Sequence, residues 1–289
     1  MNIRPEEQAE FDKVKSLYEE GMPIREISRK VLPGKDRISK FLKEINIFRT
    51  PEDIAIMKSK DMMNYDYMDN IDTPEKAYFF GFFVGDGHLD LKDSSVYWHL
   101  SSTDLSLLVC FGNNFGVKPN TRTDGRSVDL RIYNRHLVRA LQNKDIHQNK
   151  TYLDNRKVVD YVPCNLINHF LRGLLDADGW ISIYRSNDKY KYELGFVGDK
   201  GLMYEVNRII NIKFNLNIKP KAKKGTFVYQ NSWQSLKDIV NIGNWLYKDA
   251  TIYLERKHEK YLEILRIYNE KNRNSGEPQK EIICGFPKG

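Results

Sequence analysis

The sequence contains few cysteines and no long hydrophobic run, and each absence excludes a class of protein. Cys110, Cys164 and Cys284 are odd in number and far apart, which argues against a disulfide framework or a cysteine-rich zinc site. The longest apolar run, AYFFGFFVG, is too short to span a bilayer, and the N-terminus is charged where a signal peptide is apolar. We therefore expect a reduced intracellular compartment and no membrane partner.

Positive charge, in contrast, is in excess. The net charge is +7 and the pI is about 9.0, while hydrophobic residues make up 40% of the 289 positions and aromatic residues 12%. This length and composition suffice for two domains or for one large one. Because clustered lysines and arginines release the counterions condensed on phosphate backbones, nucleic acid is the first partner to expect.

Residues 1–50 have the pattern of three short helices with tight turns. The segments EEQAEFDKVKSLYEEG, PIREISRKVL and KDRISKFLKEINI each place apolar residues at helical spacing. The alternative to a DNA-binding module is a small helical bundle with solvated charges. The phrase EEGMPIREISRKV…DRISKFLKEINIFR resembles the helix-turn-helix of resolvases, in which the third helix enters the major groove. That resemblance implies DNA contacts from Lys35, Arg37, Ser39 and Lys40. A linker is expected over 51–72.

Two phrases about ninety residues apart are nearly the same: FFGFFVGDGHL at 79–89 and FLRGLLDADGWIS at 170–182. Each is followed by the same predicted order, so that helix, two strands, helix, two strands, helix occurs twice. The strands are expected near 88–92, 96–102, 120 and 128–133, and near 180–184, 190–197, 218–221 and 226–230. An internal duplication explains this order. We expect subdomains at 73–164 and 165–272, and a loose tail at 273–289.

The repeated phrase predicts that two carboxylates, one from each copy, lie close together. Each predicted helix carries small residues four apart, Gly81 with Gly85 and Gly173 with Ala177. Such stripes allow two helices to cross closely, which would bring Asp86 and Asp178 together. Neighbouring carboxylates repel unless a cation neutralises them. Mg²⁺ binds through one or two carboxylates and substrate phosphate, and metal ions between carboxylates hydrolyse phosphodiesters. The alternatives are helices that only pack a core, and a calcium loop at DADG, which lacks the later ligands.

The motifs LRGLLDADG at 171–179 and FFGFFVGDG at 79–87 resemble those of single-chain, two-motif LAGLIDADG homing endonucleases, over about 73–272. The resemblance implies an α+β fold of tandem αββαββα repeats that form a pseudo-two-fold saddle of antiparallel sheets. It also implies Mg²⁺, with Mn²⁺ as a substitute, held by Asp86 and Asp178 and by the carbonyls of Gly85 and Ala177. Asp176 would serve helix-end packing or hydrogen bonding, and its counterpart is Val84.

Family members also place basic side chains near the scissile phosphates and across the sheets. The catalytic candidates are Lys150 in the first half and Lys257, with Lys248 as an alternative, in the second; the alternative for each is a solvated charge. The sheet residues expected to contact DNA are Arg122, Arg126, Arg131, Lys219, Lys221, Lys223 and Lys224. Which of them touch phosphates and which read bases stays open.

The function that the resemblance implies is a monomeric, sequence-specific endonuclease. It would cut both strands of double-stranded DNA across the minor groove of a long asymmetric site. The expected location is cytoplasmic, in a phage or bacterial host. Two alternatives share the fold: a maturase that binds structured intron RNA, and a cleavage-inactive DNA-binding regulator. Both motif acids are intact, which favours an enzyme, although a maturase can also retain them. No splicing blocks flank the motifs, which disfavours an intein.

Overall fold

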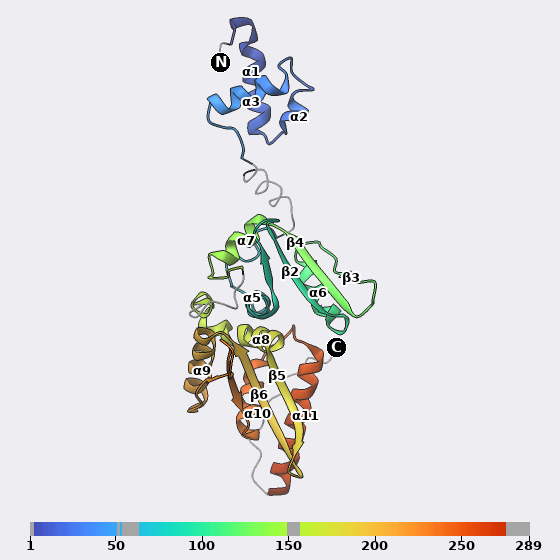
Figure 1. Ribbon diagram of the computed structural model, residues 1–289, viewed down its shortest axis with the longest axis vertical. Coiled ribbons are helices and arrows are strands. Elements are labelled where there is room, and N and C mark those ends of the chain that lie inside the picture. The colour runs from blue at the N-terminus through green and yellow to red at the C-terminus, as the bar shows by residue number, and fades with distance from the viewer. Residues whose placement is uncertain (1–2, 51–52, 54–63, 149–156, 276–289) are drawn as a thin grey trace. The chain divides into compact units, whose positions relative to one another are not determined.

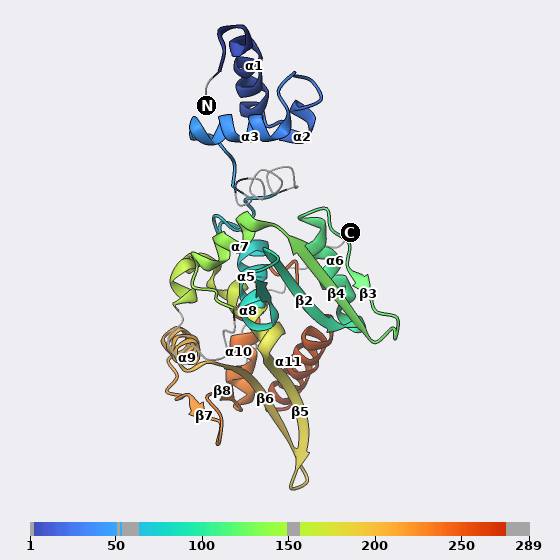
Figure 2. The same ribbon diagram turned by 45° about the horizontal axis from the view of Figure 1, so that its top comes forward.

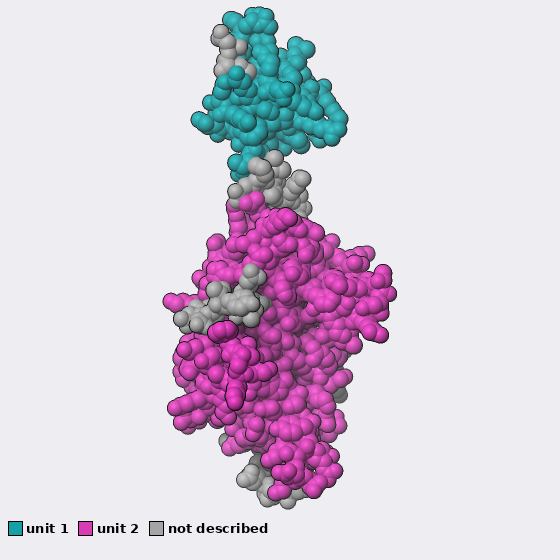
Figure 3. Space-filling model, viewed as in Figure 1, with its two compact units in different colours: residues 1–58 teal, residues 59–289 magenta. Residues whose placement is uncertain are grey.

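The computed structural model describes residues 3–50, 53, 64–148 and 157–275, and the chain divides into two compact units at residues 1–58 and 59–289 (Figure 3). Most of the expected linker at 51–72, and the tail from residue 276 onward, lie outside the described residues. Within the described ranges, no helix combines the length and the apolar character needed to cross a bilayer.

Over residues 3–50, the first unit has three α-helices around a small core. A short 3-10 turn, η1 (Pro5–Glu7), precedes α1 (Gln8–Glu19), α2 (Ile24–Ile27) and α3 (Lys35–Glu44). Their apolar faces meet at the fully buried side chains of Phe11, Val14, Ile27, Ile38 and Leu42. The second helix is shorter than predicted. Arg29 N and Lys30 N donate to the carbonyls three residues back, at 3.1 and 2.8 Å, and this tightening ends the helix.

The second unit repeats one series of elements (Figure 1). The first copy comprises α5 (Pro74–Asp86), β1 (His88–Asp90), β2 (Ser95–Ser101), α6 (Leu105–Asn113), β3 (Asn120–Thr121), β4 (Ser127–Tyr133) and α7 (Arg135–Gln142). The second comprises α8 (Ile167–Asp178), β5 (Gly179–Ser186), β6 (Lys189–Gly198), α9 (Lys200–Phe214), β7 (Lys221–Ala222), β8 (Tyr229–Trp233) and α10 (Leu236–Leu246), followed by α11 (Glu255–Ser275). Short 3-10 turns lie between some of them: η2 (Ser102–Asp104), η4 (Val158–Tyr161) and η5 (Cys164–Leu166). The predicted tandem αββαββα order is confirmed.

Each copy forms one four-stranded antiparallel sheet. The strand orders are β1-β2-β4-β3 and β5-β6-β8-β7, which are equivalent. Burial alternates along the long strands, so one face of each sheet is apolar. Helices α6 and α7 pack against the first sheet, and α9, α10 and α11 against the second (Figures 1 and 2). The opposite face of each sheet, which we call its open face, carries the polar residues.

Two strands of the second copy lie further along the chain than predicted. Strands β7 and β8 begin about three residues later than the sequence pattern indicated, because the turn is centred on Gly225, whose φ is +77°. Lys223 N donates to the carbonyl of Val228 at 2.8 Å and closes that turn. Strands β5 and β6 are longer than predicted. Asn187 and Asp188 both adopt positive φ, 48° and 61°, and this two-residue turn allows pairing to continue to its edge.

Candidate active site and nucleic-acid interface

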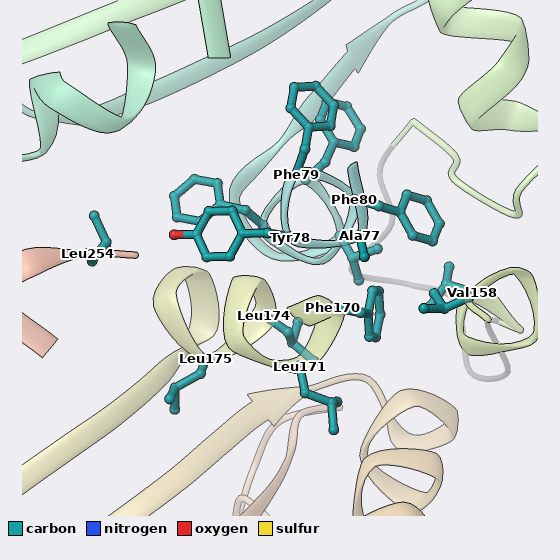
Figure 4. Packing of buried hydrophobic residues seen from close by; sticks show 14 of the residues in the cluster. Ala77, Tyr78, Phe79, Phe80, Val158, Phe170, Leu171, Leu174, Leu175 and Leu254 are labelled. Carbon is teal, nitrogen blue, oxygen red and sulfur yellow. The ribbon is translucent and has the colours of Figure 1, made fainter. Parts of the chain in front are cut away.

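Helices α5 and α8 cross at the centre of the second unit with their backbones in close approach. A Cβ atom added to Gly81 would lie 2.0 Å from the carbonyl oxygen of Phe170, and one added to Gly173 would lie 2.1 Å from the carbonyl oxygen of Tyr78. No side chain fits at either position. The small residues therefore allow the two helices to cross closely, as the sequence pattern predicted. Figure 4 shows the aromatic and aliphatic side chains that pack around the crossing.

The crossing brings the two helix ends together. A Cβ at Gly85 would lie 2.3 Å from the Cβ of Ala177 and 3.1 Å from Asp178 Oδ2. Asp86 is the last residue of α5, and Asp178 is the last residue of α8. Both aspartates are half-buried, and both carboxylates raise the pKa of the same buried ammonium, that of Lys257. The two motif acids thus share one neighbourhood that solvent can reach.

Lys257, from the first turn of α11, caps the end of α8. Its ammonium is buried and donates three hydrogen bonds of 2.7 Å, to the carbonyls of Leu175, Asp176 and Gly179. An ammonium has three protons, so all of its donors are used by the backbone. Burial lowers the pKa of Lys257 to about 8, although Asp176 opposes the shift. The positive charge at a helix C-terminus also complements the helix dipole.

Replacing Lys257 with Met is expected to destabilise the second unit by about 2–4 kcal/mol, because carbonyls lose charged donors inside the protein. Urea unfolding followed by tryptophan fluorescence measures this, since all four tryptophans lie in residues 98–245. The matched control is Lys260→Met on the same helix, where the lysine is half-exposed and pairs with Glu263 at 3.2 Å. Equal stabilities of the two variants would contradict the capping role.

Asp176 is fully buried and links both motif helices to the chain beyond α10. Its Oδ2 accepts from the Tyr78 hydroxyl of α5 and from Leu254 N, each at 2.8 Å, and Figure 4 shows the Tyr78 oxygen directed toward Leu254. Burial raises the pKa of Asp176 to about 6. Among the described residues its Oδ1 has no hydrogen-bond partner. The expectation of helix-end hydrogen bonding fits these contacts, and Val84 is the apolar counterpart in the first copy.

Arg172 completes this buried network, and sequence reasoning missed it. Its guanidinium is inaccessible to solvent and donates to the carbonyls of Leu246 and Ile252, at 2.8 and 2.9 Å. It also lies 2.8 Å from His169 Nδ1, and burial together with this cation lowers the pKa of His169 to about 4. The only signal in the sequence was an arginine inside an otherwise apolar motif, FLRGLL.

The open face of the first sheet carries arginines that already have acidic partners. Arg131 lies 3.2 Å from Asp90 and covers the Tyr97 ring at 4.5 Å. Arg122 donates to Asp129 at 2.7 Å, and this pairing raises the pKa of the guanidinium. Arg126, the third predicted contact, is exposed in the turn before β4. The pairing was not visible in the sequence, because each partner comes from a different strand or turn.

The open face of the second sheet is basic. Lys219, Lys221, Lys223 and Lys224 are all exposed, on β7 and the segments on either side of it. Between this region and the start of α10 lies an open groove of about 540 Å³, and its lining includes Lys219, Lys221, Gln230 and Ser232. The predicted basic residues of the second copy therefore gather at one edge of its sheet.

The remaining predicted residues are more scattered. Lys150 lies outside the described residues. In the first unit Lys35 and Lys40 are exposed on α3 and Ser39 is half-buried. Arg37 donates to both carboxylate oxygens of Glu7, at 2.8 and 3.1 Å, and lies over the Phe11 ring. This guanidinium thus holds α3 to the start of α1. Among the described residues, no cluster of three or more His, Cys, Asp or Glu side chains could hold a metal.

Comparison with known proteins identifies the fold. No family model and no curated protein matches the sequence. A mutant of the meganuclease I-SmaMI is 11% identical, with 70% of this chain and 93% of that chain covered and a TM-score of 0.50. The LAGLIDADG homing endonuclease I-GzeII in complex with its DNA target is 12% identical (72% and 93% covered, TM-score 0.49). The LAGLIDADG meganuclease I-AabMI bound to uncleaved DNA is 13% identical (69% and 92% covered, TM-score 0.47). The second unit has the two-domain α+β fold of the LAGLIDADG homing endonucleases.

Proposed function

We propose that this chain, which has the fold of the LAGLIDADG homing endonucleases, is itself such an enzyme: a divalent-metal-dependent, sequence-specific endonuclease of double-stranded DNA. The observation that carries the proposal is the meeting of two aspartate-bearing helix ends. Gly85 and Ala177 are in contact distance there, and Asp178 Oδ2 lies beside Gly85. A fold alone does not imply a function, and these two acids are what an enzyme would require.

The donor set at the helix ends fits Mg²⁺. It offers two carboxylates, Asp86 and Asp178, together with carbonyl oxygens, and in the part of the chain that the structure describes no third His, Cys, Asp or Glu side chain joins them in a metal-binding cluster. Mg²⁺ prefers oxygen ligands and keeps several positions for water and substrate phosphate, so two carboxylates suffice. Because both side chains are half-buried and not enclosed, a phosphodiester could approach them. Mn²⁺ has the same ligand preference and should substitute.

Different residues of the protein would have different roles in hydrolysis. Asp86 and Asp178, with the carbonyls of Gly85 and Ala177, would hold the metal, which when bound supplies charge stabilisation and activates the attacking water. Lys257 would keep the end of α8 in place. Two pseudo-equivalent copies in one chain would present one aspartate for each strand, so a single chain could cut both strands of an asymmetric site. The two open faces, one basic and one with paired arginines, would position the duplex.

The test is cleavage of a plasmid that carries the encoding locus with its insertion joined out, in Mg²⁺ and in EDTA. Linear product in Mg²⁺ alone is the expected result, and its ends would give the site. Tight DNA binding without cutting in any divalent metal would support the inactive regulator. Binding that structured intron RNA competes away would support the maturase.

The first unit is proposed to make a separate DNA contact through α3. Replacing Lys35 and Lys40 together with Ala should weaken binding to the target and lower the salt slope by about two, since each phosphate contact contributes about one. The matched control replaces Lys13 and Lys15, which are exposed on α1 and carry the same charge. Filter binding over a range of salt concentrations measures both variants. Identical slopes would exclude a specific role for α3.

A further inference from the structure

An ion pair joins the two copies of the second unit. Arg256, in the first turn of α11, donates from Nε and Nη2 to the two carboxylate oxygens of Asp104, each at 3.2 Å. Asp104 is the last residue of η2 in the first copy, and its side chain is 8% exposed, whereas that of Arg256 is 54% exposed. Two parallel bonds from a planar guanidinium fix the direction of approach as well as the distance. The pair therefore holds α11 to the first copy in one orientation.

Arg256 and its neighbour in the sequence, Lys257, contact different copies. Lys257 binds the carbonyls at the end of α8, the helix that carries Asp178. Asp104, the partner of Arg256, follows β2, and β2 pairs with β1, which begins two residues after Asp86. Two consecutive residues of α11 thus connect the aspartate-bearing end of one motif helix to the sheet that continues from the other. A rotation of one copy relative to the other has to strain this connection.

The helix crossing alone does not fix the angle between the copies. The glycine contacts set the distance between α5 and α8 at one point, and rotation about that point is limited by contacts away from it. One such contact lies near the start of α5, where Thr251 Oγ1 donates to Glu75 Oε1 at 2.9 Å. The Arg256 pair lies toward the other end of the crossing, because Arg256 adjoins Lys257, which caps the end of α8. The chain beyond α10 therefore holds the first copy on both sides of the crossing.

We infer that Arg256 and Asp104 are positioning residues, which hold the two copies at the angle needed to cut both DNA strands in one binding event. The inference rests on the proposed function, in which one aspartate serves each strand. The two scissile phosphates of a duplex lie at a fixed separation, so a chain whose copies rotate brings only one phosphate at a time into line. A misplacement of about 1 Å can cost about a hundredfold in rate. Loss of the pair should therefore slow the second cut and leave the first cut nearly as fast.

The experiment is single-turnover cleavage in Mg²⁺ of a supercoiled plasmid that carries the site, with the supercoiled, nicked and linear forms separated by electrophoresis. The wild type should give linear product with little accumulation of nicked circles. Arg256→Gln and Asp104→Asn should each slow the step from nicked to linear DNA about tenfold or more, and the first cut less than about threefold. The matched control is Arg208→Gln, since the Arg208 side chain is 57% exposed and pairs with Glu205 within α9 at 2.7 Å. This control should give the wild-type pattern.

The double variant Arg256→Gln with Asp104→Asn should be no slower in the second cut than either single variant, because one interaction is lost only once. Additive slowing, a wild-type pattern in both single variants, or equal accumulation of nicked circles in the Arg208→Gln control would overturn the positioning role while the endonuclease proposal stands. Absence of cleavage by the wild type in Mg²⁺ and in Mn²⁺ would overturn both.

Tryptophan fluorescence during urea unfolding checks that the variants are folded. If they are not, Arg256→Lys keeps the question decidable, because lysine retains the positive charge and loses the planar fork. This variant should still accumulate nicked circles above the wild-type level, and a wild-type pattern would overturn the positioning role.

Discussion

Asp86→Asn and Asp178→Asn should each reduce metal-dependent DNA cleavage by about a thousandfold or more. Asparagine has the same size as aspartate but no charge, so it removes a ligand for the divalent cation without disturbing the close contact of Gly85 and Ala177. A metal ion supplies several kcal/mol of charge stabilisation at the reacting phosphate, and each 1.36 kcal/mol corresponds to a factor of ten. Single-turnover cleavage of a plasmid that carries the site measures the loss.

Binding should persist in both variants, which separates chemistry from docking. Removing a carboxylate near the phosphates lowers like-charge repulsion, so affinity measured in EDTA should be equal to or tighter than that of the wild type. The matched control is Asp160→Asn, an exposed aspartate of η4, which should cut at the wild-type rate. Full-rate cutting of both strands by Asp178→Asn would refute the assignment of the two motif acids.

The sequence predicted the frame of the second unit because that frame depends on local patterns. Small residues four apart, an Asp-Gly end and the alternation of polar and apolar residues are properties of short segments, and each occurs in both copies. The structure confirms the order of elements and the close crossing of α5 and α8. Strand limits moved where a turn decided them, as at Gly225 with its positive φ.

The partners of charged side chains could not be predicted in the same way. Lys257 contacts carbonyls at residues 175–179, and Arg131 pairs with Asp90 across a sheet. Nothing in the local sequence tells a solvated lysine from one that caps a distant helix, because both occur in an amphipathic pattern. The candidate lysines were therefore chosen by resemblance, and the burial of Lys257 assigns its protons to the backbone.

The second prediction concerns stability and follows from the close crossing of α5 and α8. Gly173→Ala should lower the free energy of unfolding of the second unit by about 3 kcal/mol or more, since overpacking of this kind is costly. Intrinsic helix propensity acts in the opposite direction, because alanine is favoured over glycine by about 1 kcal/mol. A net loss would therefore measure the clash of the new Cβ with the Tyr78 carbonyl, 2.1 Å away. Urea unfolding followed by tryptophan fluorescence reports it.

Gly81→Ala should cost a comparable amount, and the double variant less than the sum of the two. The two glycines face each other's helix across one crossing, so a separation forced by the first Cβ makes room for the second, and neighbouring sites of this kind are not additive. Gly198→Ala is the control, since its Cβ would meet no backbone atom but only side-chain ends, the flexible tip of Met203 at 3.1 Å and Leu202 Cδ2 at 3.4 Å. If the losses in unfolding free energy at Gly81 and Gly173 were additive, each contact would relax on its own. The two helices would then not separate as rigid bodies.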